Sequence, residues 1–368
     1  MTATLSPPPA PTPTPQAVPE VAPRRGPNWR KIAIALGRTL VAVGGAIVIF
    51  GAFMQMKGAN PIDAYRSMWE STLQSSDSIE QILVKATPLI FAALAVTVPA
   101  RAGLVNVGGE GQLVMGGVGG AAVVQWLGTG LPIGLALPLM ALGGIVGGAL
   151  FAGIAALLKL KFDINEAVST LLLNYVAVDV MLFLIYDAWK DPHGSGQPAT
   201  APVPTNEQLP LIGNSSVHLG FVLAIVATGL VWFALTRTSW GFKLSVVGGN
   251  PEAARQAGLK VGLLLLSAML VGGALTGLGG FTQLAGVEHK LRPGYLLTYG
   301  YIGFLASWLA RHHPIRVALA ATLLAAIAVG GDSLQLDSAL PAASVNVLMA
   351  LVLLGVFGWG GKRKAVAA

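Results

Sequence analysis

The sequence has no cysteine and very little charge. The absence of cysteine among 368 residues excludes disulfide bonds, thiolate metal ligands and cysteine nucleophiles. Charged residues make up 11% of the chain, less than half of the ~25% found in an average soluble domain. Hydrophobic residues make up 54%, and a membrane-spanning helix needs about 20 predominantly apolar residues in a row. This composition predicts an all-α fold, a polytopic helical membrane protein.

Several catalytic signatures are absent as well. The chain has no GxxxxGKS/T phosphate-binding loop and no HExxH zinc motif, and its five histidines show no metal-ligand spacing. The formal net charge is +7, but the basic residues stand at the ends of apolar runs instead of forming the cluster that nucleic-acid binding needs. The sequence therefore predicts no catalytic residue, metal or cofactor on this chain, and no nucleic-acid partner.

Ten apolar runs predict about ten transmembrane helices. They cover residues 39–56, 81–100, 104–126, 132–158, 166–187, 218–236, 261–286, 295–310, 315–330 and 341–358. If the chain begins in the cytoplasm, 17 of its 23 basic residues lie on the cytoplasmic side, five lie outside and Lys85 lies within a span. Because cytoplasmic loops carry the excess of Lys and Arg, this solution places both termini in the cytoplasm.

The segments outside these runs divide the chain further. Residues 1–30 are Pro-rich and have almost nothing to bury, which predicts a disordered cytoplasmic tail. Residues 31–361 form the transmembrane domain, and residues 362–368 form a basic cytoplasmic tail. Of the two long outer segments, residues 57–80 are expected to hold an amphipathic helix, and residues 188–217 form an irregular loop that contains five prolines.

A short helix is specified in the longest cytoplasmic loop, at about residues 250–258. Asn250 is a favoured N-cap, Pro251 suits the first helical position, and Glu252 complements the positive end of the helix dipole. Gly258 is placed to end the helix in a left-handed turn. The segment is either a surface turn or a docking element for a cytoplasmic partner.

Polar residues inside the spans are candidates for a translocation pathway. Glu166, Thr170 and Asn174 recur every four residues and share one helix face, which either lines a wet cavity or bonds to a neighbouring helix; we favour the cavity. Asp179 lies about 140° away from that stripe and is expected to be buried and bonded to another helix. The full candidate set is Asn106, Glu110, Gln112, Glu166, Thr170 and Asn174.

Glycine is abundant, with 47 residues, and several glycines form GxxxG pairs. Such pairs let helix backbones approach closely in a membrane, where apolar burial does not drive helix association. We expect tight packing, with sliding helices as the less favoured alternative. The pairs are Gly116/Gly120, Gly143/Gly147, Gly144/Gly148 and Gly273/Gly277.

Five motifs, in order, make the chain resemble the permease subunit of bacterial ABC importers for nucleosides and simple sugars. The closest branch works with binding lipoproteins of the basic-membrane-protein type. The motifs span most of the membrane region, from about residue 81 to residue 316. They are residues 106–112 (NVGGEGQ), 165–175 (NEAVSTLLLNY), 190–192 (KDP), 249–258 (GNPEAARQAG), and 279–280 (GG) followed by 286–294 (GVEHKLRPG).

The resemblance implies a function and a set of partners. The chain would be the translocation subunit of a nucleoside importer in the bacterial inner membrane. It would pair with a second permease subunit, a separate ATP-binding subunit that holds ATP and Mg²⁺, and an extracytoplasmic binding protein. The coupling helix that docks on the ATP-binding subunit would comprise Asn250, Pro251, Glu252, Ala253, Ala254, Arg255 and Gly258.

Three alternatives stay open. Lys290 and Arg292 lie on the predicted outer face, where they either contact the binding protein or form a loop salt bridge with Glu288. The cargo could equally be a simple sugar or another small polar solute. An ion-coupled secondary transporter is the alternative from a different class, although it would give the capped cytoplasmic helix no role.

Overall fold

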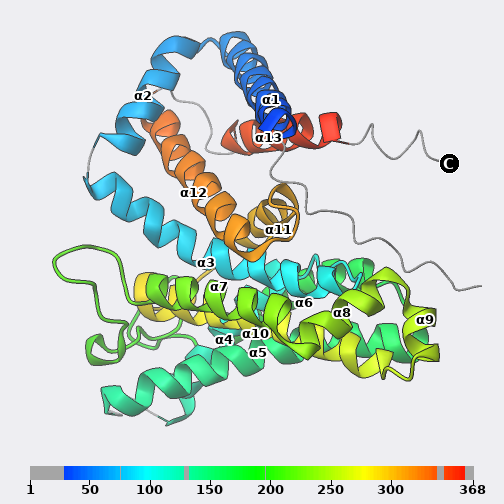
Figure 1. The fold of residues 1–368 in the computed structure, drawn as a ribbon. Helices are drawn as coiled ribbons and strands as arrows, with labels where there is room; N and C mark the ends of the chain where they lie inside the picture. Colours follow the sequence, from blue (N-terminus) through cyan, green and yellow to red (C-terminus); the bar gives the residue numbers. More distant parts are fainter. Residues whose placement is uncertain (1–28, 75, 128–131, 195, 338–343, 361–368) are drawn as a thin grey trace, which may run out of the picture.

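The computed structural model describes residues 29–74, 76–127, 132–194, 196–337 and 344–360. This part of the chain contains no strand, and 78% of the described residues are helical, arranged as 13 α-helices (Figure 1). The bounds are α1 Trp29–Met56, α2 Pro61–Leu73, α3 Ser76–Arg101, α4 Gly109–Leu127, α5 Ile133–Phe162, α6 Glu166–Tyr186, α7 Gly220–Arg237, α8 Ser239–Gly249, α9 Pro251–Gln256, α10 Val261–Gln283, α11 Tyr299–Leu309, α12 Pro314–Asp337 and α13 Ser344–Gly360. Two short elements add to these, the 3₁₀-helix η1 (Thr205–Glu207) and the π-helix η2 (Leu284–Glu288).

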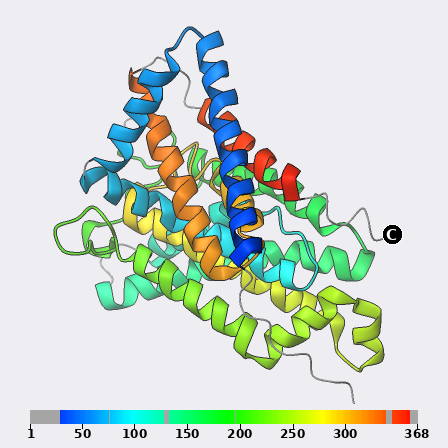
Figure 2. The same ribbon diagram turned by 45° about the horizontal axis from the view of Figure 1, so that its top comes forward.

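The helices form a bundle with two distinct ends. Helices α4, α5, α7 and α10 run side by side, and α3 lies between this group and α11 and α12. The long loop between α6 and α7 lies at the left end of the bundle in Figure 1, and α8 and α9 lie at the right end. Helices α1 and α13 pack on each other, and the turned view in Figure 2 shows them side by side.

Close contact between α5 and α10 rests on glycine. A Cβ atom on Gly277 would lie 2.0 Å from the carbonyl oxygen of Gly144, and one on Gly148 would lie 2.3 Å from the carbonyl oxygen of Gly273. No side chain fits at these distances, so the backbones themselves are in contact. The prediction that the glycine pairs serve tight packing is confirmed for α5 and α10.

Asparagine side chains cap the N-termini of three helices, and one of these caps, at Asn250, is predicted from the sequence. The side chain of Asn60 accepts a hydrogen bond from the backbone N–H of Ile62 at the start of α2, which confirms a helix within residues 57–80. Asn165 and Asn250 cap α6 and α9 in the same way. Between residues 188 and 217 the described chain is irregular apart from η1, as expected.

The fold class is confirmed, with detail on the spans. Each of the ten predicted runs contains a helix. Among the described residues, six helices are long and apolar enough to cross a membrane, and the bent pair α1–α2 would make a seventh. Helices α4, α11 and α13 do not meet the same test. Parts of the predicted tails and of the last predicted span lie outside the described residues, at residues 1–28, 341–343 and 361–368. The last two residues of the predicted N-terminal tail, Trp29 and Arg30, belong to α1.

Two predicted spans are wrong in their first turns. The span predicted at residues 104–126 begins with non-helical backbone, and α4 starts only at Gly109. The span predicted at residues 295–310 likewise becomes helical only at Tyr299, so α11 has 11 residues and is about 16 Å long. The reason is local: glycine-rich sequence precedes α4, and Pro293 and Gly294 precede α11, whose N-cap Thr298 has a left-handed φ of 72°.

Candidate functional site

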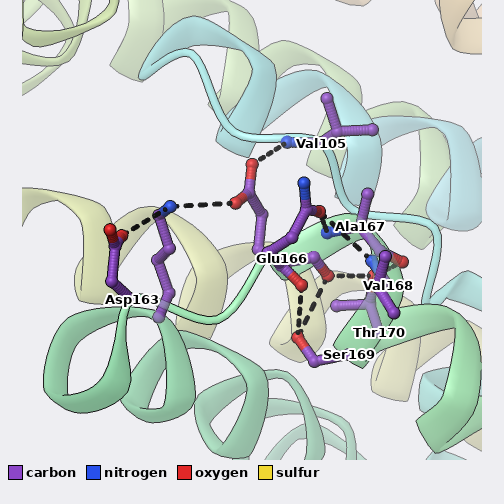
Figure 3. Close-up of polar contacts among 9 residues, drawn as sticks. Val105, Asp163, Glu166, Ala167, Val168, Ser169 and Thr170 are labelled. Atoms are coloured by element: carbon purple, nitrogen blue, oxygen red, sulfur yellow. Dashed lines mark hydrogen bonds and ion pairs between the residues drawn. The ribbon is translucent and has the colours of Figure 1, made fainter.

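The first turn of α6 holds the extended segment that leads into α4. Asn165 caps the helix by accepting hydrogen bonds from the backbone N–H groups of Ala167 and Val168 (Figure 3). The carboxylate of Glu166 points away from the helix axis and accepts a hydrogen bond of 3.2 Å from the backbone N–H of Val105. Its other oxygen lies 3.8 Å from the ammonium group of Lys159.

The next two members of the stripe bind the same segment. The hydroxyl of Thr170 accepts a hydrogen bond of 3.1 Å from the backbone N–H of Val107. The side-chain oxygen of Asn174 accepts one of 2.8 Å from the backbone N–H of Gly111, and its amide donates to the carbonyl of Val107 at 3.0 Å. Both side chains are buried. Asn174 therefore caps α4 from a different helix, which satisfies a backbone donor that a helix start leaves open.

Glu110 caps the N-terminus of α11 from a different helix, as Asn174 caps α4. Its carboxylate is buried and accepts hydrogen bonds from the backbone N–H groups of Thr298 and Gly300, the latter at 2.8 Å. Thr298 offers α11 no side-chain cap of its own. A Cβ atom on Gly300 would lie 2.0 Å from the nitrogen of Glu110, so the two helix N-termini touch. The carboxyl group of Glu110 thus satisfies backbone donors that the start of α11 leaves open.

Asn106 and Gln112 form a reciprocal amide pair beneath this junction. Each amide nitrogen donates to the other residue's oxygen, at 3.1 and 3.0 Å. Asn106 also donates to the carbonyl of Ala95 in α3, and Gln112 accepts from the hydroxyl of Thr276 in α10. The pair thus ties the start of α4 to two neighbouring helices.

All six predicted pathway residues make hydrogen bonds at the starts of α4 and α11 or in the segment that leads into α4, and we call them the cross-cap cluster. Its members are Asn106, Glu110, Gln112, Glu166, Thr170 and Asn174. Thr170 and Asn174 bond to a neighbouring segment, so our preference for a wet cavity beside the stripe is wrong for these two residues. Glu166 bonds to the same segment and also lines a cavity of about 1020 Å³. Because these side chains are committed to backbone partners, the cluster fixes the backbone around the start of α4. A direct role for it in translocation stays a prediction.

Asp179 contradicts the expectation that it is buried. It is exposed on α6, thirteen residues after Glu166, and has no hydrogen bond or ion pair with any residue that the structure describes. Sequence reasoning also missed Asp332, which pairs with Lys85 beside a cavity of about 280 Å³. Tyr301 was missed too; its hydroxyl lies 3.3 Å from the amide of Asn174.

At the end of the bundle that holds α8 and α9, the predicted short helix is present. The side-chain oxygen of Asn250 accepts hydrogen bonds of 3.0 Å from the backbone N–H groups of Glu252 and Ala253. Gly258 follows with a left-handed φ of 79°. Glu252 and Arg255 form an exposed ion pair, and only Ala254 is buried. Pro251 and Arg255 also line a cavity of about 1020 Å³ with Lys159 and Glu166.

At the opposite end, Lys290 and Arg292 line a cavity of about 410 Å³ together with Tyr186 and Asp191. Arg292 makes a two-pronged ion pair with Glu288, at 2.7 and 3.1 Å, so the loop salt bridge that we kept as an alternative is present. Lys290 is exposed and has no ion pair with a described residue. Contact of either residue with a binding protein stays a prediction.

These features define a membrane-embedded helical protein with an exposed, capped helix at one end and a polar cavity at the other. Residues 78–357 match the family model described as the permease component of the branched-chain amino acid transport system. The chain belongs to this permease family.

Curated relatives agree with this membership. The chain is 36% identical to a glucose ABC transporter permease protein of Haloferax volcanii, over 91% of this chain and 90% of the relative. It is 30% identical to a guanosine ABC transporter permease protein of Bacillus subtilis, over 88% and 91%. A nucleoside ABC transporter permease protein of Lactococcus lactis is 29% identical, over 85% and 88%.

Proposed function

We propose that this chain is the permease subunit of an ATP-driven importer that carries nucleosides across the bacterial cytoplasmic membrane. An ATP-binding subunit would hold ATP and Mg²⁺ and dock on α9. A second permease subunit would complete the pathway, and an extracytoplasmic binding protein would deliver the solute. The observation that carries the proposal is α9, a short helix capped by Asn250 and exposed on all but one of its side chains.

The shape of α9 suits a docking element. Capping by Asn250 and the ion pair between Glu252 and Arg255 hold the helix in shape before a partner arrives. A preformed helix loses little conformational entropy on binding, so a small contact area is enough for association. Because α9 packs on α8 and α10, movement of α9 would be transmitted into the bundle.

The test reverses the charges of α9. We expect Glu252→Arg combined with Arg255→Glu to abolish copurification of the ATP-binding subunit, while the chain still inserts into the membrane. The matched control is Arg66→Glu with Glu70→Arg, which reverses an exposed ion pair on α2. Retained copurification and unchanged uptake in the α9 variant would contradict the docking assignment.

Nucleosides are proposed as cargo because guanosine and nucleoside permeases recur among the relatives. The similarity to a glucose permease supports a simple sugar as the second candidate. Uptake of labelled guanosine and of labelled glucose is compared in cells that carry the whole transporter. Guanosine uptake that unlabelled adenosine competes supports a nucleoside carrier, and glucose uptake without guanosine uptake supports a sugar carrier.

Lys290 is the better candidate for the binding-protein contact, because Arg292 is already paired with Glu288. We expect Lys290→Glu to weaken docking of the binding protein, measured by pull-down at low salt. Lys57→Glu, which reverses another exposed charge of the same predicted side, is the control. Unchanged docking of the Lys290 variant would remove this contact from the proposal.

A further inference from the structure

The turn between α11 and α12 gathers basic residues that have no acidic partner. Residues 311–316 read RHHPIR, and no aspartate or glutamate occurs between Glu288 and Asp332. Arg311 and Arg316 are exposed, and neither makes an ion pair or a side-chain hydrogen bond with a described residue. The turn therefore presents two positive charges that are free to bind an anion.

The turn lies at the predicted cytoplasmic end of the bundle. Trp308 and His312 line a cavity of about 180 Å³ with Ala100 and Gly103, where α3 ends. A Cβ atom on Gly103 would lie 3.4 Å from the Cα atom of Gly248, in the last turn of α8. The basic turn is thus on the side that holds α8 and α9. The cytoplasmic leaflet on this side carries the anionic lipids that attract basic segments.

The backbone of the turn is held in an unusual conformation. Arg311 and His312 have left-handed φ angles of 53° and 56°, which non-glycine residues keep only where surrounding contacts fix them. The Nδ1 atom of His312 lies 3.0 Å from the hydroxyl of Ser307, which lies 2.9 Å from the hydroxyl of Thr97 in α3. Trp308 packs edge-on against the same imidazole, with ring centroids 4.9 Å apart. These contacts fix the backbone that carries Arg311 before any ligand binds.

An apolar face of α12 begins directly at the basic turn. Ile315, Leu319 and Leu323 are exposed at a spacing of four residues, so they share one side of the helix, and the half-buried Ile327 continues it. From Arg316 to Ile327 this face is about 16 Å long at 1.5 Å per residue, which is about half of a hydrocarbon core of ~30 Å. The face therefore matches the acyl chains of one leaflet, with a positive charge at its predicted cytoplasmic end.

This combination fits a lipid better than a cytoplasmic protein. A protein that docks on the turn from the cytoplasm would leave the apolar face of α12 without a use. Trp308, beside the turn, is 38% exposed, and tryptophan is enriched at membrane interfaces. The guanidinium group of arginine binds phosphate oxygens through two parallel hydrogen bonds. Charge and apolar surface together thus complement a phospholipid with a negative headgroup.

We propose that the α11–α12 turn binds the headgroup of an anionic phospholipid of the cytoplasmic leaflet. Arg311 and Arg316 bind its phosphate oxygens, and its acyl chains lie along Ile315, Leu319 and Leu323. The bound lipid holds the ends of α11 and α12 at the membrane surface. The inference goes beyond the proposed function and requires only that the chain is embedded in a membrane.

Native mass spectrometry of the detergent-purified full-length chain measures lipid binding directly. The probes are cardiolipin and phosphatidylglycerol, which are anionic, and phosphatidylcholine, which has no net charge. The test variant combines Arg311→Gln with Arg316→Gln. The control combines Lys161→Gln with Lys260→Gln, which removes two exposed positive charges from the same predicted side.

We expect the natural chain to bind the two anionic lipids more tightly than phosphatidylcholine. The arginine variant should bind them about 25-fold more weakly, since each basic residue at an anionic membrane surface contributes about fivefold in affinity. The lysine variant should change the affinity little, because it leaves both arginines in place. Arg311→Lys with Arg316→Lys keeps the charges but not the two-pronged hydrogen bonds, so its affinity should fall between the two. If the double glutamine variant does not accumulate, Arg316→Gln decides, with an expected loss of about fivefold.

Equal affinity for anionic and neutral lipids overturns the inference, and so does an equal loss in the arginine and lysine variants. Displacement of the lipid by excess inorganic phosphate would assign the arginines to a free phosphate and overturn the lipid site. Loss of a copurifying subunit with unchanged lipid affinity would assign them to a protein partner, with the same consequence. None of these results bears on α9, so the importer assignment is tested separately.

Discussion

The two sides of α6 treat polar groups in opposite ways. On the buried side, Glu166, Thr170 and Asn174 each accept a hydrogen bond from a backbone N–H of residues 105–111. On the exposed side, Asp179 has no partner among the described residues. A buried polar group without a hydrogen bond destabilises the fold by about 1–3 kcal/mol. A buried side chain that hydrogen-bonds to the backbone therefore contributes to stability. A charged side chain without a partner on the exposed face of a membrane helix is a candidate functional residue.

The largest loss of stability is expected from replacing Glu110, whose carboxylate accepts two backbone hydrogen bonds. Glu110→Ala leaves the N–H groups of Thr298 and Gly300 without acceptors and frees a left-handed Thr298. We expect a loss of about 4 kcal/mol in the free energy of unfolding, from two unpaired donors at about 1–3 kcal/mol each. Thermal unfolding in detergent measures it. Asp179→Ala is the comparison and should change stability little; an equal loss from both would break the distinction.

A matched pair of substitutions on α6 sharpens the comparison. Asn174→Leu removes the acceptor for Gly111 and the donor to Val107, and we expect a loss of about 3 kcal/mol. Asp179→Leu places the same side chain five residues further on, on the exposed face, and should leave thermal stability within about 0.5 kcal/mol. Uptake should show the reverse pattern per folded molecule, with Asp179→Leu the more damaging. Similar melting temperatures for both variants would refute the assignment of the two faces.

His218 extends the comparison to a group whose charge depends on pH. It is buried, its Nδ1 accepts from the backbone N–H of Gly220, and burial, with a smaller effect of His289, lowers its pKa to about 4. The folded state therefore favours neutral His218. Its contribution to stability is complete above pH 6.5 and is lost as pH falls toward 4; at pH 5 the loss is about 2 kcal/mol.

We expect His218→Asn, which keeps an acceptor for Gly220, to reduce the drop in melting temperature between pH 7.5 and pH 5. His193→Asn, at an exposed position, should leave that drop as it is. An unchanged pH dependence in the His218 variant would show that other groups carry the acid sensitivity.

The smallest effect is expected for a polar pair on the surface. Arg292 and Glu288 are tied to each other, but the arginine side chain is 54% exposed. We expect their coupling energy to be below about 1 kcal/mol, and smaller still in high salt. A double-mutant cycle with Arg292→Ala and Glu288→Ala measures it. A coupling energy as large as the stability loss from Asn174→Leu would mean that an exposed ion pair stabilises the fold as much as a buried hydrogen bond.

The sequence alone was enough for the parts of the fold that depend on local chemistry. Apolar runs located a helix in each of ten segments, and Asn250 with Pro251 located α9. Periodicity also placed Glu166, Thr170 and Asn174 on one face. These features follow from neighbours within a few residues, which a sequence displays directly.

What the polar residues do was decided only by the tertiary structure. The sequence favoured a wet cavity beside the α6 stripe, but Thr170 and Asn174 bond to a neighbouring segment and only Glu166 lines a cavity. The sequence also predicted a buried Asp179, which is exposed. Periodicity gives the angle between two side chains on a helix but not which face meets a neighbour. That choice depends on backbone about 60 residues away for Thr170 and Asn174, and 190 residues away for Glu110. Only folding brings those donors to the acceptors, and the side of α6 left without them is the one that remains exposed.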